Sequence, residues 1–258
     1  MKSYRVNGDA FCTPIRTYRR DGQTVTSVSA VHVGRQEYWD AVQKEMDRIA
    51  IGLYEGVSKG VGGGSDDEFL KVLDDLKDFA TNCLGGTFQN GVLTYPTAWE
   101  NADISTDDFS ADESMRRRAA KFRGLAEDIK KLYEKYPEEI EGIIGRGFLF
   151  LSRYGLLSNA FFLGVGRGYR KILEQERNEV LIERIDSKLR TDIEELGIVY
   201  GAGHLKAIDR HLRNSGFGLE NEKWLVALDF SDRLPFWESL MSIRKKSRSK
   251  ARQKRVEE

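Results

Sequence analysis

One short stretch, LGIVYGAGHLKAIDRH at 196–211, limits the fold more than any other part of the chain. It begins with the apolar run Ile198-Val199-Tyr200, in which two β-branched residues favour a buried strand. Gly201 and Gly203 follow and allow a turn and close approaches that a Cβ would prevent. The residues after them have the apolar spacing of a helix. This order places His204 just past the carboxyl end of a strand, where open α/β sheets bind ligands.

A histidine in a tight turn is often a structural hydrogen bonder, so His204 alone does not define a site. A second stretch of the same kind lies near the other end of the chain. Thr13–Arg19 and Gln23–Val33 are rich in strand formers and flank Asp21-Gly22, which predicts a β-hairpin. His32 then lies at the end of the second strand.

A crossover unit is predicted to follow this hairpin. The apolar spacing from about Arg35 to Arg48 indicates a helix, and Ile49–Tyr54 reads as a second buried strand. Glu55 comes directly after that strand, and a lone buried carboxylate is costly. If the two strands are parallel, His32 and Glu55 lie at the same edge of the sheet. The alternative is that Glu55 is an exposed loop carboxylate.

The remaining segments predict further helices and one more strand. Helices are expected to start at Ser65 and Ser110, and 84–105 is expected to be an irregular loop over the sheet edge. Pro137 is expected to end the second of these helices. The apolar segment 143–165 is predicted to form a helical hairpin, in the core or at a contact within a homo-oligomer. The alternative is a membrane-associated helix. Last come a long helix at about 169–195 and a strand at 223–230.

Composition favours one soluble domain. The chain has 258 residues and no net charge, which suits a single α/β (α+β) domain at 1–242. In this domain a mixed central sheet is flanked by helices, with a large helical insertion at about 106–195. We expect no membrane span and no signal peptide. Cys12 and Cys83 have no metal or disulfide spacing, which indicates reduced thiols in the cytoplasm.

The end of the chain is strongly basic. Residues 243–258 hold eight Lys or Arg and two Glu, a net charge of +6, so the rest of the chain carries −6. Such a segment could contact nucleic acid or an anionic membrane. We expect a disordered, solvated tail instead, because these residues include no aromatic side chain that could stack on a base.

Four short motifs together resemble the TraB/PrgY-like family, in the superfamily that also holds Tiki proteases, erythromycin esterase and ChaN. The motifs are Ser29-Ala-Val-His32, Leu53-Tyr-Glu55-Gly56, Gln175-Glu-Arg177-Asn178 and Gly201-Ala-Gly-His204-Leu205. Their order matches the family pattern of two G-x-x-H elements, a Glu after a strand and an Arg-Asn pair. The first element departs from the pattern, because Ser29 stands where the family usually has Gly. Gln89, Tyr95 and Ala102-Asp103 are similar to a less specific part of the pattern.

The resemblance implies a site made of His32, Glu55 and His204. In Tiki members such residues imply a metal-dependent hydrolase, and two imidazoles with a carboxylate suit Zn, Mn or Co and leave a position for water. In the esterases a His and a Glu can instead activate water without metal. The implied substrate is a peptide or a small ester or amide. The alternative is a regulatory or ligand-binding protein without catalysis. The supporting residues implied are Gln89, Tyr95, Asp103, Arg177, Asn178, Gly201 and Gly203.

We also predict that Asp103 and Arg177 belong to one site. Arg177 lies one residue from the apolar stripe of the predicted long helix, so its guanidinium reaches the boundary of the core and needs a partner. Asp103 or Glu55 could supply a bidentate carboxylate. The alternative is two separate surface charges that contribute little to stability.

Overall fold

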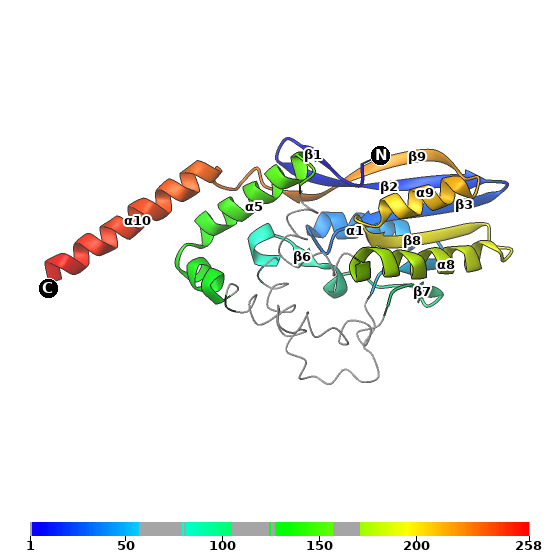
Figure 1. Ribbon diagram of the computed structural model, residues 1–258, viewed down its shortest axis with the longest axis horizontal. Coiled ribbons are helices and arrows are strands. Elements are labelled where there is room, and N and C mark those ends of the chain that lie inside the picture. Colours follow the sequence, from blue (N-terminus) through cyan, green and yellow to red (C-terminus); the bar gives the residue numbers. More distant parts are fainter. Residues whose placement is uncertain are drawn as a thin grey trace, which may run out of the picture.

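A mixed sheet forms the centre of the computed structural model, which describes residues 2–56, 79, 81–104, 124, 127–156 and 171–257 (Figure 1). Its strands follow the spatial order β1-β2-β3-β8-β5-β7. In addition, β9 pairs with β2 on the side of β2 that faces away from β3. Their bounds are Arg5–Asn7 (β1), Ala10–Arg20 (β2), Gln23–Ala30 (β3), Gly52–Tyr54 (β5), Trp99–Asn101 (β7), Glu195–Gly201 (β8) and Gly218–Asp229 (β9). The run β3, β8, β5 and β7 is parallel, whereas β1, β2 and β9 are antiparallel to their partners. The expected α/β fold with a mixed sheet is confirmed.

The predicted hairpin is the pair β2 and β3. Asp21 and Gly22 join the strands with φ angles of 44° and 84°. Two positive φ values are what a two-residue turn of type I′ requires, and Asp-Gly is a favoured sequence for it. The turn therefore fixes the register in which Arg20 pairs with Gln23.

Helices cover both faces of the sheet. Their bounds are Gln36–Met46 (α1), Pro137–Arg153 (α5), Arg177–Leu189 (α8), Leu205–Asn214 (α9) and Phe236–Glu257 (α10). A π-helical turn, Lys171–Glu176 (η2), precedes α8. Two short strands, Val33–Gly34 (β4) and Thr87–Phe88 (β6), pair with each other outside the main sheet. A 3-10 turn, Gln89–Gly91 (η1), follows β6. Because strand side chains alternate, the core divides into one cluster against α1 and another against α8 and α9. The protein is thus a three-layer α/β/α arrangement.

The parallel strands bring four chain segments to one edge of the sheet. Ala30 at the end of β3 pairs with Gly201 at the end of β8. Tyr54 at the end of β5 pairs with Val199 of β8 and with Asn101 at the end of β7. The residues that follow these four strands therefore lie near one another, at the edge where such sheets bind ligands.

In the middle of the chain, expected elements and bounds differ from the structure. Residues 84–105 include β7, so the segment adds a strand to the sheet, where we expected an irregular loop. The long helix ends at Leu189, since β8 already begins at Glu195. Pro137 begins α5, because a proline is tolerated in the first helical turn, where its missing N–H costs nothing.

The basic tail is also different from our expectation. The sequence from Ile243 was expected to be disordered, but α10 continues through it to Glu257. The strand expected at 223–230 is longer than predicted, because β9 begins at Gly218. Among the described strands β9 pairs with β2 alone, so it is an edge strand of the described sheet. Most of the helices expected from Ser65 and Ser110, and the second half of the hairpin in 143–165, lie outside the described residues. In the part of the chain that is described, no helix is long and apolar enough to cross a membrane.

Candidate functional site

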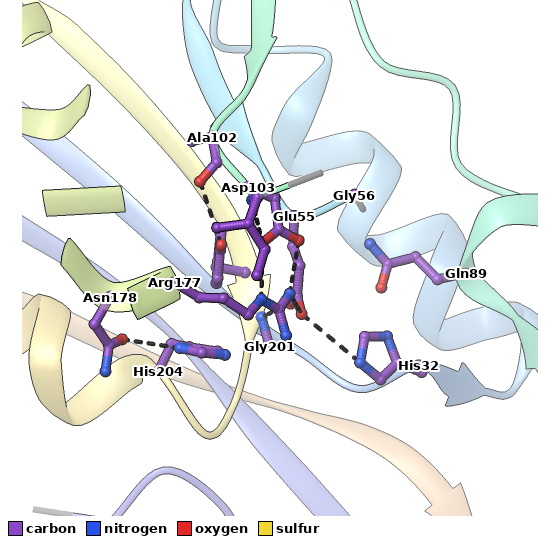
Figure 2. A network of polar contacts seen from close by, with 12 residues as sticks. His32, Glu55, Gly56, Gln89, Ala102, Asp103, Arg177, Asn178, Gly201 and His204 are labelled. Carbon is purple, nitrogen blue, oxygen red and sulfur yellow. Dashed lines mark hydrogen bonds and ion pairs between the residues drawn. The ribbon is translucent and has the colours of Figure 1, made fainter. Parts of the chain in front are cut away.

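Four polar side chains follow the four parallel strands and meet at one edge of the sheet. His32 follows β3, Glu55 follows β5, Asp103 follows β7 and His204 follows β8. Arg177, at the first position of α8, lies among them (Figure 2). Chain segments far apart in sequence therefore build the site, and the sheet sets their spacing.

Glu55 is the centre of this network. The residue is 5% exposed, its Oε1 accepts a hydrogen bond from Arg177 Nη2, and its Oε2 accepts one from the backbone N–H of Gly201. A Cβ at position 201 would lie 2.7 Å from Oε2, so the close approach requires glycine there. Burial alone would raise the pKa of Glu55, but at the acid pH where Glu55 titrates the positive charges of His32, Arg177 and His204 outweigh burial and lower the pKa to about 2. The carboxylate is therefore ionised.

Arg177 is held by two carboxylates. Its Nε donates to Oδ1 of Asp103 and its Nη2 to Oδ2, both at 2.7 Å, in a bidentate pair. Burial would lower the pKa of Arg177, but the charge of Glu55 and the contacts with Asp103 raise it. The predicted contact between Arg177 and Asp103 is present, and the guanidinium is charged and fixed in place.

His204 is oriented by Asn178, the residue after Arg177. Its Nδ1 lies 2.8 Å from Oδ1 of Asn178, and since an amide oxygen only accepts, Nδ1 carries the proton. The other ring nitrogen, Nε2, then has a free lone pair. Burial lowers the pKa of His204 although Glu55 opposes the shift. His204 is thus a neutral imidazole of one tautomer, and its ring packs edge-on against Tyr200.

His32 differs from His204 because it is exposed. Its side chain is 57% exposed, and Nε2 lies 3.8 Å from Oε1 of Glu55. The backbone holds it, since the N–H of Gln89 donates to the His32 carbonyl at 2.9 Å. The ring also stacks on Phe88 of β6 with centroids 5.8 Å apart. One imidazole of the site is therefore open to solvent and the other is buried.

Gln89 contributes a buried polar group beside His32 (Figure 2). Its Nε2 donates to the hydroxyl of Tyr95 at 2.8 Å, while Oε1 is buried and has no hydrogen-bond partner among the described residues. A buried acceptor is costly to leave unpaired. Tyr95 stacks on Tyr54 with centroids 3.8 Å apart, and burial raises its pKa to about 12, so the phenol stays protonated.

Two of the residues in the site depart from the sequence analysis. Gly203 was expected to permit a close approach, but a Cβ there would meet no described residue within 4 Å, and its φ is not positive. Tyr200 was treated only as a strand residue, yet it contacts His204 and lies under Arg177, whose Cζ is 5.7 Å from the ring centroid. The sequence signal that could have indicated this role of Tyr200 is its position, directly before the glycine that ends the strand.

The residues implied for a metal do not form a metal centre in this arrangement. Both oxygens of Glu55 already accept hydrogen bonds, and the Arg177 guanidinium lies where a cation would bind. Across the described ranges, no group of three or more His, Cys, Asp or Glu is placed to hold a metal ion. A positively charged group against the carboxylate disfavours a second cation. We therefore derive no chemistry through a metal.

Comparison with models of protein families, with curated proteins and with solved structures finds no match to this chain.

Proposed function

We propose that the protein is a hydrolase that cleaves an ester or amide bond of a peptide or small molecule, with His32 as the general base. The observation that carries the proposal is an exposed imidazole beside a buried, ionised carboxylate, His32 Nε2 and Glu55 Oε1 at 3.8 Å. A carboxylate behind an imidazole orients it and stabilises its protonated form. Such contacts are often longer without substrate and shorten in the complex.

In the proposed reaction, Nε2–H of His32 points to Glu55 and Nδ1 removes a proton from water. The hydroxide formed attacks the carbonyl carbon, and the imidazolium returns the proton to the leaving oxygen or nitrogen. Arg177 does not contact the reacting atoms in this proposal. Its role is to keep Glu55 ionised through its positive charge. Gln89 is a positioning residue, because its backbone N–H donates to the His32 carbonyl at 2.9 Å.

Kinetics of matched histidine variants test this proposal. Hydrolysis of p-nitrophenyl esters and of a peptide library is measured for the wild type, His32→Gln and His211→Gln. His211 is the control, because it pairs with Asp186 away from the site. We expect His32→Gln to lose about 100-fold or more in kcat/KM, while His211→Gln and EDTA have no effect. Equal rates for His32→Gln and the wild type would contradict the proposal, and metal loss that abolishes activity would restore the metal hypothesis.

One observation favours a second candidate, a binding protein without turnover. Both oxygens of Glu55 accept hydrogen bonds from protein groups, so the carboxylate already has a structural role that needs no catalysis. This candidate predicts that substrate amides raise the melting temperature without any product, and that His32→Gln weakens this shift.

We propose further that the protein belongs to the TraB/PrgY-like family and acts in the cytoplasm. The four motifs that resemble the TraB/PrgY-like family lie together at one sheet edge, which supports membership. Cys12 and Cys83 are buried and not disulfide-bonded, a state that a reducing compartment maintains, which supports the cytoplasm.

A further inference from the structure

The C-terminal helix α10 uses one face to pack on α5. Ser239 is fully buried, and the Ser242 hydroxyl donates to Oε1 of Glu139 at 2.6 Å. Lys246 pairs with the same carboxylate oxygen at 2.5 Å. These contacts fix the rotation of the helix, so the opposite face is defined as well.

That opposite face carries an apolar end followed by a basic end. At about 100° per residue, the positions opposite α5 are Trp237, Met241, Arg244, Lys245 and Arg248, which we call the outer face of α10. All five are exposed, Trp237 by 74% and Met241 by 60%. Phe236 and Leu240, each 38% exposed, enlarge the apolar end. Figure 1 shows the C-terminal part of α10 projecting away from the sheet.

We propose that the outer face of α10 docks on an anionic membrane surface. Indole and thioether side chains at this exposure have an unfavourable contact with water, and tryptophan prefers the interface between headgroups and acyl chains. The basic residues that follow on the same face would lie over the anionic headgroups. The charges suit such a surface, since residues 243–258 carry a net +6.

The structure changes the expectation drawn from the sequence. Contact of the basic tail with a membrane or nucleic acid was disfavoured because the tail has no aromatic residue. The continuous helix removes that objection, because Trp237 shares one face of the same helix with the exposed residues Arg244 and Arg248. Nucleic acid fits less well, since single-strand sites combine aromatic and basic groups along one groove. Here Phe236, Trp237, Leu240 and Met241 are grouped at one end, with Glu238 among them.

Co-sedimentation of the full chain with vesicles tests the proposal. The probes are phosphatidylcholine vesicles with and without about 30% phosphatidylserine. We expect binding to the anionic vesicles alone. The triple variant Arg244→Gln/Lys245→Gln/Arg248→Gln should lower the partition coefficient on the order of 100-fold, and Trp237→Ser/Met241→Ser about 10-fold.

The matched control removes three exposed positive charges elsewhere, with Lys44→Gln/Arg184→Gln/Arg210→Gln. It should bind vesicles like the wild type, and circular dichroism should show all variants folded. Three results would overturn the proposal: no binding of the wild type to anionic vesicles, an equal loss in the control, or tight binding of a labelled DNA oligonucleotide with none to vesicles.

Discussion

Asn178 decides which nitrogen of His204 carries the proton, and a single substitution tests this. Asn178→Asp places a carboxylate against Nδ1–H at the observed 2.8 Å, so the pKa of His204 should rise from its lowered value by about 1 or more. The chain has three histidines, so NMR titration of the ring protons resolves His204. An unchanged titration in Asn178→Asp, with His211 as the internal reference, would show that the contact does not exist in solution.

The pair of Arg177 and Asp103 should stabilise the fold because both groups are buried. Arg177→Met leaves two buried carboxylates without their cation, which should cost about 3–5 kcal/mol in the free energy of unfolding. A double-mutant cycle with Asp103→Asn, measured by urea unfolding, should give a coupling energy above about 1 kcal/mol.

The control for this cycle is the more exposed pair of Lys188 and Glu100, whose side chains are 23% and 49% exposed. Lys188→Met should cost less than about 1 kcal/mol. Additive effects of Arg177→Met and Asp103→Asn, or a loss no larger than that of Lys188→Met, would mean that the two charges act separately.

At the scale of the element, β7 pairs with β5 and packs against the sheet through one aromatic side chain, Trp99. The Trp99 ring covers Gly52 of β5 and Gly197 of β8, and its Nε1 donates to the Ile49 carbonyl at 3.0 Å. A Cβ at position 197 would lie 2.7 Å from the ring. The two glycines therefore make the space that lets β7 pack as the next strand.

Gly197→Ala should consequently displace Trp99 and destabilise the protein by about 1–3 kcal/mol, with a shift in tryptophan fluorescence. Gly147→Ala is the matched control, since a Cβ there meets nothing within 4 Å in the middle of α5. It should stabilise the protein by about 0.5–1 kcal/mol in thermal unfolding. If both substitutions have the same effect, Trp99 does not depend on the glycine.

At the scale of the whole molecule, the buried network should make stability depend on acid pH. The folded pKa of Glu55 is about 2, below the ordinary value of 4.5. A lowered folded pKa means that the stabilisation is full above about pH 4.5 and is lost as the pH falls toward about 2, on the order of 3 kcal/mol. Urea unfolding between these pH values measures it. Glu55→Gln should flatten this part of the profile, and a profile identical to that of the wild type would assign the acid sensitivity to other groups.

Local patterns in the sequence were enough for most of the elements that carry the site, β7 excepted. The Asp21-Gly22 turn, α1, and the strand, turn and helix around His204 were all predicted, because each depends on spacing and turn chemistry within a few residues. The meeting of Arg177 with Asp103 was also predicted, from the cost of a buried charge. The hydrolase activity and the family stay predictions.

Tertiary structure decided three features: the strand β7, the helical C-terminal segment and the partners of Glu55. Each of them depends on neighbours that are distant in sequence. Trp99–Asn101 becomes a strand only through pairing with β5 and the space above two glycines. The basic end of the chain is helical because α10 continues from turns that pack on α5. Glu55 was read from sequence as a metal ligand, but the fold brings Arg177 and the Gly201 N–H to both of its oxygens. Sequence could name the charged residues and the pairing of Arg177 with Asp103, whereas only the packing determined both partners of Glu55.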